Sequence, residues 1–373
     1  MRKHRVAFID YFPTHYRKRL YEKLGERLDA DFYFFADERE HFWNPRIPLV
    51  QSGDFHRVEL RRMRIAGHSV MPGIAPRLRP GRYDAVIKSL NGRLMLPLVY
   101  GASRASRLPF VLWTGMWHHP KTRFHHISRR PAEAVYRGAD SIVVYGDHVR
   151  RFLLEVPGVA ADKVYVAGQA VRAEHFEGIA TPETSPPHAL FVGQFERRKG
   201  LDYLFDAFKA VSDPAARLRI VGNGSLESEV HERASRDPRI EVMGYVPQER
   251  LPDELARARC LVLSSVTTAR AREPWGLVVN EAMHAGLPVI ATTAVGAAAG
   301  GLVVDGRNGI VVPERDARSL AGALGRLLGD PDTAAEMGRR GADDAKAFDY
   351  DRMADAFVSA VEHAVAAKSG GSD

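Results

Sequence analysis

Short apolar runs alternate with longer amphipathic stretches along this chain of 373 residues. The apolar runs of the first half predict strands at residues 5–9, 31–35, 85–87, 110–113, 141–144 and 163–167. Residues 16–28 carry apolar or aromatic side chains at 20, 21, 24 and 28, which is the spacing of one helix face. This alternation predicts a parallel sheet covered by helices on both faces.

A polar, proline-rich stretch at 181–187 interrupts the pattern and is predicted to be a linker between domains. The alternation then restarts. The strands predicted in the second half are 189–192, 218–221, 240–242, 261–263 and 288–291, and the helices are 201–211, 277–285, 317–328 and 332–368. We therefore expect two doubly wound α/β domains, over 1–172 and 173–349, with ligands bound in the cleft between them.

Composition supports a soluble protein, with 45% hydrophobic and 27% charged residues. The one cysteine, Cys260, lies in an apolar run and is predicted to be a core residue, which fits a reducing compartment. Residues 285–304 carry no charge, but glycines and a proline interrupt them, so we expect a strand and loop rather than a membrane span. The expected location is the cytoplasm.

The net charge of +7 comes partly from basic clusters at 17–27, 61–64 and 77–82. They fit solvated helix faces and phosphate-binding residues, or peripheral contact with the inner face of an anionic membrane. Nucleic acid is not expected as a partner, because aromatic residues are not interleaved with these cations.

A candidate phosphate site lies at the start of the second half. Gly193 and Gln194 follow a predicted strand, and Arg198 and Lys199 stand beside a predicted helix N-terminus. Backbone donors, the positive helix end and two cations suit a phosphate. The alternative is a turn with surface basic residues.

Two further loops follow strands in this half. Gly222 and Asn223 form a glycine turn where backbone could approach a ligand, although the full dinucleotide fingerprint is missing. Tyr245 and Val246 could frame a planar base.

The strongest candidate segment is 272–283. We expect a helix with Pro274 in its first turn, so that Glu273 lies at its N-terminus and Glu281 about two turns further on. A nucleotide diphosphate sugar along this helix would place its phosphates at the N–H groups, a sugar hydroxyl at Glu273 and the ribose at Glu281. The N–H groups belong to Trp275, Gly276 and Leu277. In isolation, the two glutamates could equally be a helix cap and an ordinary helical residue.

The order of these motifs over about 190–312 resembles the family 4 retaining glycosyltransferases of the GT-B fold, which carry a glycosyltransferase group 1 domain. The motifs are Gly193…Lys199-Gly200, Val221-Gly222-x-Gly224, Gly244-Tyr245-Val246, Glu273-Pro274-Trp275-Gly276…Glu281-Ala282-Met283 and Asp305-Gly306-x-Asn308-Gly309. The resemblance implies two Rossmann-like domains facing a cleft, with the C-terminal helix, about 350–373, crossing back to the first. It also implies transfer of a hexose-type sugar from a nucleotide diphosphate sugar to a hydroxyl of a glycan, lipid-linked glycan or natural product.

In such an enzyme, Arg198 and Lys199 would hold the diphosphate, Glu273 the donor sugar and Glu281 the ribose. No metal or other cofactor is expected, because two cations can replace a metal ion on the diphosphate. The family usually has arginine where this chain has Gln194, which leaves the role of Gln194 open.

The acceptor is expected against the first half. His118 and His119 follow a predicted strand, and either could contact the donor sugar as a catalytic residue. Trp117, His15 and Arg17 are acceptor-side candidates. A zinc site from neighbouring histidines lacks a recognisable ligand spacing. Two other functions remain open, namely a nucleotide-sugar epimerase on the same architecture and a sugar-binding protein without turnover.

Overall fold

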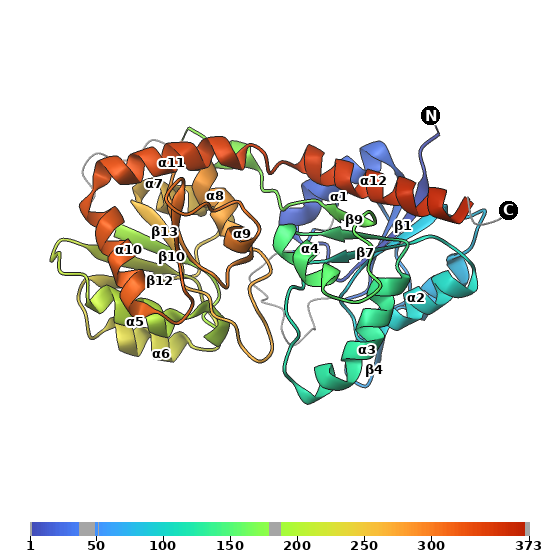
Figure 1. The fold of residues 1–373 in the computed structure, drawn as a ribbon, viewed down its shortest axis with the longest axis horizontal. Helices are drawn as coiled ribbons and strands as arrows, with labels where there is room; N and C mark the ends of the chain where they lie inside the picture. Colours follow the sequence, from blue (N-terminus) through green and yellow to red (C-terminus); the bar gives the residue numbers. More distant parts are fainter. Residues whose placement is uncertain (1, 37–48, 51, 179–187, 370–373) are drawn as a thin grey trace.

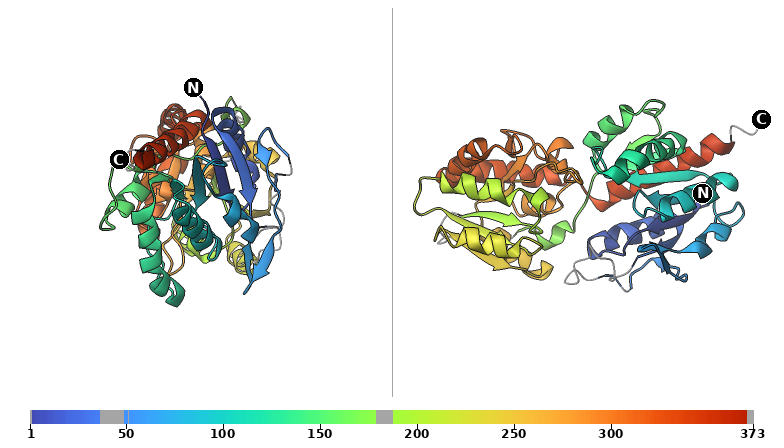
Figure 2. Two further views of the ribbon diagram at one scale, coloured as in Figure 1. Left: turned by 90° about the vertical axis from the view of Figure 1, so that its right-hand side faces the viewer. Right: turned by 90° about the horizontal axis from the view of Figure 1, so that it is seen from below.

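The computed structural model describes residues 2–36, 49–50, 52–178 and 188–369, with only the backbone of 123–125 and 369. The predicted linker at 181–187 lies outside these residues. Two α/β domains lie side by side, each built on its own parallel sheet (Figures 1 and 2).

The first sheet has seven strands in the order β3-β2-β1-β6-β7-β8-β9. Its strands are β1 (Arg5–Asp10), β2 (Asp29–Phe34), β3 (His56–Arg57), β6 (Ala85–Ser89), β7 (Phe110–Thr114), β8 (Ser141–Val144) and β9 (Val164–Val166). A separate antiparallel pair is formed by β4 (Met63–Ile65) and β5 (His68–Val70). The helices of this half are η1 (His15–Arg17), α1 (Lys18–Arg27), η2 (Pro72–Arg77), α2 (Met95–Ala105), α3 (Arg123–Gly138), α4 (Asp147–Leu154) and η3 (Ala173–His175).

Both faces of the first sheet are buried, as expected of a parallel sheet. Along β1, Phe8 enters one core cluster and Ile9 the other, because successive side chains point to opposite faces. Phe8 packs near α1, where Tyr21 lies 5.8 Å from it between ring centroids.

The second sheet has six parallel strands in the order β12-β11-β10-β13-β14-β15. They are β10 (His188–Val192), β11 (Arg217–Val221), β12 (Ile240–Gly244), β13 (Cys260–Leu263), β14 (Val289–Thr292) and β15 (Gly309–Val312). The helices are η4 (Arg197–Lys199), α5 (Leu201–Lys209), α6 (Glu227–Ala234), η5 (Gln248–Arg250), α7 (Leu251–Arg257), α8 (Val278–His284), α9 (Gly296–Ala299), α10 (Ala317–Gly329) and α11 (Pro331–Ala345). Cys260 is buried in this core, as predicted.

The strand order reverses once in each sheet, between β1 and β6 and between β10 and β13. Loops that leave the carboxyl ends of such neighbouring strands diverge and open a crevice, where ligands bind in doubly wound folds. Ligand sites are therefore expected in two crevices. One lies between the loops after β1 and β6, and the other between the loops after β10 and β13.

The helix predicted over 332–368 is in fact two helices, α11 and α12 (Tyr350–Ser369), separated at residues 346–349. The chain crosses there to the first domain, where α12 packs against α1 and β8 (Figure 1). Ser141 Oγ donates a hydrogen bond to the Ala360 carbonyl at 2.7 Å. The predicted return of the C-terminal helix is confirmed, whereas the exact boundary at 172 and 173 stays a prediction.

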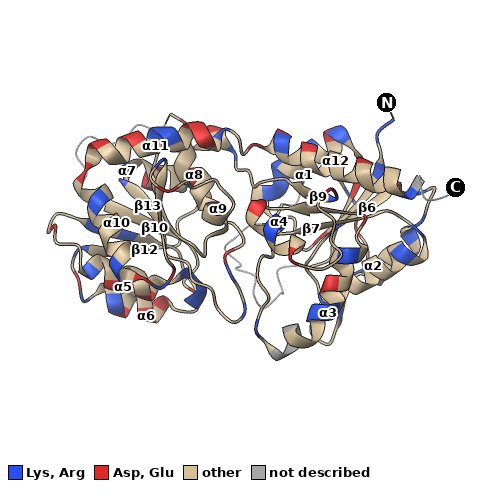
Figure 3. Cartoon of the chain, viewed as in Figure 1, with Lys and Arg blue, Asp and Glu red and all other residues tan. Residues whose placement is uncertain are grey.

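Much of the basic cluster at 17–27 binds acidic residues of the same chain. Lys23 lies 3.0 Å from Asp351 of α12, and Arg27 contacts Asp351 at 2.6 Å. Positively and negatively charged residues are accordingly mixed along α1 and α12 (Figure 3). No helix in the described part of the chain combines the length and the apolar character needed to cross a membrane.

Candidate functional site

Loops from β10 and β13 meet at the switch point of the second sheet. After β10, the chain turns through η4 and enters α5 at Gly200, whose φ is 62°. A side chain at this position would lie 2.0 Å from the Ser264 carbonyl oxygen, measured from Cβ. Only glycine tolerates both the positive φ and this contact. The close crossing brings Lys199 next to Ser264 and Ser265, which follow β13.

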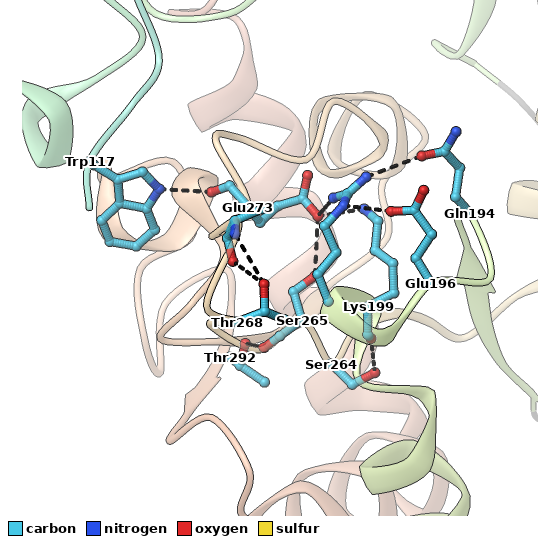
Figure 4. Close-up of polar contacts among 11 residues, drawn as sticks. Trp117, Gln194, Glu196, Lys199, Ser264, Ser265, Thr268, Glu273 and Thr292 are labelled. Atoms are coloured by element: carbon cyan, nitrogen blue, oxygen red, sulfur yellow. Dashed lines mark hydrogen bonds and ion pairs between the residues drawn. The ribbon is translucent and has the colours of Figure 1, made fainter. Parts of the chain in front are cut away.

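Glu273 lies between the two loops and accepts three hydrogen bonds at one oxygen (Figure 4). Lys199 Nζ lies 2.5 Å from Oε2, Arg198 Nη1 2.8 Å and Ser265 Oγ 3.3 Å. Burial favours the neutral acid, but Lys199 and Arg198 outweigh it and lower the pKa of Glu273. The site thus holds a buried, ionised carboxylate against two cations.

Arg198 is held in place by residues of its own loop. Glu196 lies 2.8 Å from its Nε, and Gln194 accepts a hydrogen bond from its Nη2 at 3.1 Å. Gln194 therefore orients Arg198, a contact that the sequence did not indicate. The neighbouring Arg197 turns away and pairs with Glu229 on the surface at 2.8 Å.

The helix after Glu273 begins within one residue of the start at 277 that the apolar periodicity predicted, but Pro274 lies outside it. It starts at Val278 and ends at His284. Trp275 is buried in the core, and Gly276 has a φ of 96°. Leu277 is the N-cap of the helix. The N–H groups of Trp275 and Gly276 therefore belong to the loop before the helix and not to its first turn.

Glu281 is buried on this short helix. Burial raises the pKa of its carboxyl group to about 7, and a hydrogen bond with Gln248 opposes the rise. Gln248 begins η5, two residues after Val246, so the predicted ribose residue Glu281 contacts the segment that follows the predicted base residues Tyr245 and Val246.

Gly222 and Asn223 pack against the loop that follows β10. A Cβ at Gly222 would lie 1.9 Å from the Gly193 carbonyl oxygen, and Asn223 accepts a hydrogen bond from the Phe195 N–H at 2.8 Å. Glycine is needed at 222 because two loops of the protein pack together.

The first domain reaches this site through two aromatic side chains. Trp117 Nε1 donates to the Glu273 carbonyl at 2.9 Å, and His148 Nε2 lies 3.0 Å from the Pro274 carbonyl oxygen. Sequence reasoning missed His148 and Ser265. Both follow the carboxyl end of a strand by a few residues, which is the signal that could have identified them.

The other histidine candidates lie beside these contacts. His119 packs against Phe152, with ring centroids 4.8 Å apart, and burial lowers its pKa. It lines a cavity of about 930 Å³ between α2, α3 and the loop after β7. His118 is half-buried in the same loop.

A second hollow, of about 530 Å³, opens at the switch point of the first sheet. Arg17 lines it, but its guanidinium group is already bound by Asp10 at 2.9 Å and by the Tyr145 hydroxyl at 2.5 Å. His15 lies in η1, just before Arg17. Of the predicted acceptor-side residues, Arg17 lines this hollow, whereas Trp117 is buried against the Glu273 carbonyl.

Across the described ranges, no three histidine, cysteine, aspartate or glutamate side chains are grouped to hold a metal ion.

The sequence of this chain is similar to those of known glycosyltransferases. A family model described as glycosyl transferases group 1 matches residues 186–330. The D-inositol 3-phosphate glycosyltransferase of Streptomyces bingchenggensis is 30% identical over 324 residues, which cover 77% of this chain and 68% of that protein. The glycogen synthase of Mycobacterium tuberculosis is 28% identical over 240 residues, or 63% of this chain and 56% of that protein. The first four curated relatives are matched over 22% to 56% of their length.

A solved structure supports the same conclusion about the fold. Alr3699/HepE from Anabaena, in complex with UDP and glucose, has a TM-score of 0.74 at 18% identity. The match covers 96% of this chain and 100% of that one. The architecture is therefore the predicted GT-B arrangement.

Proposed function

The chain belongs to the glycosyl transferases group 1 family, and on this premise we propose that it moves a hexose-type sugar from a nucleotide diphosphate sugar to an acceptor hydroxyl. The observation that carries the proposal is the cluster of Arg198, Lys199 and Glu273 at the switch point of the second sheet. Two fixed cations beside a buried carboxylate suit a diphosphate joined to a sugar.

In this proposal, Arg198 and Lys199 bind the diphosphate and stabilise the charge that develops on it as the sugar leaves. Both side chains already contact the carboxylate of Glu273. They are therefore in position before the diphosphate binds, and the diphosphate and Glu273 would share them. Two cations then take the part that a metal ion plays elsewhere, and no metal is needed.

The reaction is proposed to retain the anomeric configuration, as in family 4. The bond between the anomeric carbon and the phosphate oxygen breaks, the acceptor oxygen bonds to that carbon from the same face, and the acceptor's proton passes to the leaving phosphate. Glu273 is proposed to bind donor sugar hydroxyls, because an ionised carboxylate accepts hydrogen bonds from them.

The nucleoside is proposed to lie over α8 and the loop after β12, with Glu281 at the ribose and Tyr245 and Val246 at the base. The Anabaena neighbour was solved with UDP, which makes UDP-sugars the first donors to test.

Arg198→Ala is expected to lower nucleotide release from a sugar donor by roughly 100-fold, because one of the two cations at the leaving group is lost. A thermal-shift screen of UDP-, GDP- and dTDP-sugars would first select the donor, and released nucleotide would then be measured. Arg197→Ala is the matched control, because Arg197 is bound to Glu229 on the surface. Wild-type protein that isomerises the sugar would instead indicate an epimerase, and saturable binding without turnover a sugar-binding protein.

The acceptor is proposed to carry an apolar portion that occupies the 930 Å³ cavity. Most of its surface is apolar, with contributions from Leu96, Pro97, Met116, Ala132 and Val135, although charged residues such as Arg93 and Lys121 also line it, and its volume lies in the range of ligand pockets. Peripheral membrane contact stays a further proposal, for which the exposed clusters at 61–64 and 77–82 are the remaining candidates.

Ala132→Trp is expected to fill the cavity and abolish binding of an alkyl ligand. The probe is octyl β-D-glucoside below its critical micelle concentration, detected by the shift of the Met116 methyl resonance. Methyl β-D-glucoside should cause no shift, and Ala105→Trp, on an exposed position of α2, should bind like the wild type. An unchanged shift in Ala132→Trp would contradict the assignment.

A further inference from the structure

Trp117 and His148 bind two consecutive carbonyl groups on the opposite domain. The Trp117 indole N–H donates to the Glu273 carbonyl oxygen at 2.9 Å, and His148 Nε2 lies 3.0 Å from the next one, of Pro274. Glu273 is therefore held twice. Its carboxylate is bound by Lys199 within the second domain, and its main chain by the first domain.

These two contacts lie in a closely packed aromatic cluster. The rings of Trp117 and His148 meet edge to face with centroids 4.7 Å apart, and the guanidinium carbon of Arg272 lies 3.6 Å from the Trp117 ring centroid. Both residues are buried, with 8% and 3% of their surface exposed. Because water has little access, the hydrogen bonds are hard to replace once they are broken.

The chemistry of His148 fits a fixed donor rather than a proton carrier. A carbonyl oxygen only accepts hydrogen bonds, so Nε2 carries the proton. Nδ1 is buried and makes no hydrogen bond to any described residue. Burial lowers the pKa of His148 to about 4, and Arg151 and Arg272 add to this effect, whereas the Pro274 carbonyl and Asp147 oppose it. The ring is neutral at ordinary pH.

We infer that Trp117 and His148 are positioning residues, which orient Glu273 only while the two domains are closed on each other. This inference rests on the proposed role of Glu273 at the donor sugar. It gives the first domain a part in catalysis that is separate from acceptor binding. When the domains move apart, the Glu273–Pro274 segment loses both contacts, and the carboxylate is no longer held from both sides.

Trp117→Phe keeps the aromatic ring and removes only the N–H donor. We expect kcat to fall about tenfold, which corresponds to one hydrogen bond, while UDP affinity stays within about twofold. His148→Ala should give a similar loss. His148→Gln should recover most of it, because an amide nitrogen can donate to the same carbonyl.

Arg151→Ala is the matched control. Arg151 Nη2 also donates to a carbonyl of the second domain, that of Ala299, at 2.7 Å, but it does not touch the Glu273 segment. If turnover depends only on the two domains being closed on each other, this variant should lose as much activity as Trp117→Phe. If the two residues act through Glu273, it should keep kcat within about twofold of the wild type.

A double-mutant cycle tests the connection directly. In a Glu273→Gln background, Trp117→Phe should cause no further loss of kcat, because residues that act through one group are not additive. A second tenfold loss, or an unchanged kcat in Trp117→Phe alone, would overturn the inference.

The inference can also be tested without turnover. The chain has four tryptophans, and the Trp117 indole resonance is identified by its loss in Trp117→Phe. Its N–H should exchange slowly with solvent in the wild type and faster in His148→Ala. Wild-type protein that releases no nucleotide contradicts the proposed function, whereas rapid exchange of this N–H in the wild type contradicts the positioning contacts.

Discussion

Glu273→Gln is expected to lower kcat by at least about 100-fold and to leave nucleotide affinity nearly unchanged. The carboxylate lies 2.5 Å from Lys199 and 2.8 Å from Arg198 and is ionised, so the amide removes the one negative charge between two cations. In the proposed reaction, that charge binds the donor sugar. The nucleoside is proposed to lie elsewhere, over α8.

Steady-state release of nucleotide gives kcat, and titration calorimetry with UDP gives the affinity. Glu254→Gln is the control, because Glu254 is also a buried carboxylate with an arginine partner, Arg219, at 3.1 Å, but lies outside the site. It should retain kcat. Equal losses of nucleotide affinity and turnover in Glu273→Gln would contradict this division of roles.

Glu281→Gln should stabilise the ligand-free protein at pH 8, by on the order of 2–3 kcal/mol. The folded state raises the pKa of Glu281 from its ordinary value of 4.5 to about 7 by burial. The folded protein therefore holds this proton more tightly than the unfolded chain does. The resulting stabilisation is complete below pH 4.5 and is lost as the pH rises through 7. The amide avoids that loss because it does not ionise.

Denaturant unfolding at pH 5 and pH 8 would measure the effect. The free energy of unfolding should fall less between these values in Glu281→Gln than in the wild type. Glu254→Gln should instead be less stable than the wild type at pH 8, because it removes the buried one of the two carboxylates that pair with Arg219, Glu241 being the other. A Glu281→Gln variant that is destabilised at pH 8 would show that the carboxylate has a favourable partner in the folded protein.

The same variant should bind UDP about ten- to 100-fold more weakly, because an amide offers one acceptor oxygen to the two ribose hydroxyls. Binding to the wild type at pH 7 should also release roughly half a proton, as the hydroxyls favour the ionised form of Glu281. Calorimetry in two buffers of different ionisation enthalpy measures that release. An equal release in Glu281→Gln would place its source on another group.

The sequence alone determined the order of the elements and the kinds of side chain at the site. Apolar periodicity is a local property, so it predicted all but one strand of the second sheet, and β15 was missed because its four residues follow a glycine-rich turn. Lys199 and Glu273 were identified because each lies in a motif whose spacing is local. The start of α8 was predicted to within one residue, but Pro274 was wrongly placed in its first turn. Proline suits that position, whereas Trp275 is buried in the core and the chain becomes helical only at Val278.

Only the tertiary structure decided which residues meet. Trp117 and Glu273 are 156 positions apart, and His148 and Pro274 are 126 apart, so no local pattern could show that they touch. The same holds for Glu281, whose pKa is set by the burial of its side chain rather than by its neighbours in sequence. The chain order supplied a carboxylate and two cations. Folding placed them at one switch point and closed the first domain onto the backbone that carries the carboxylate.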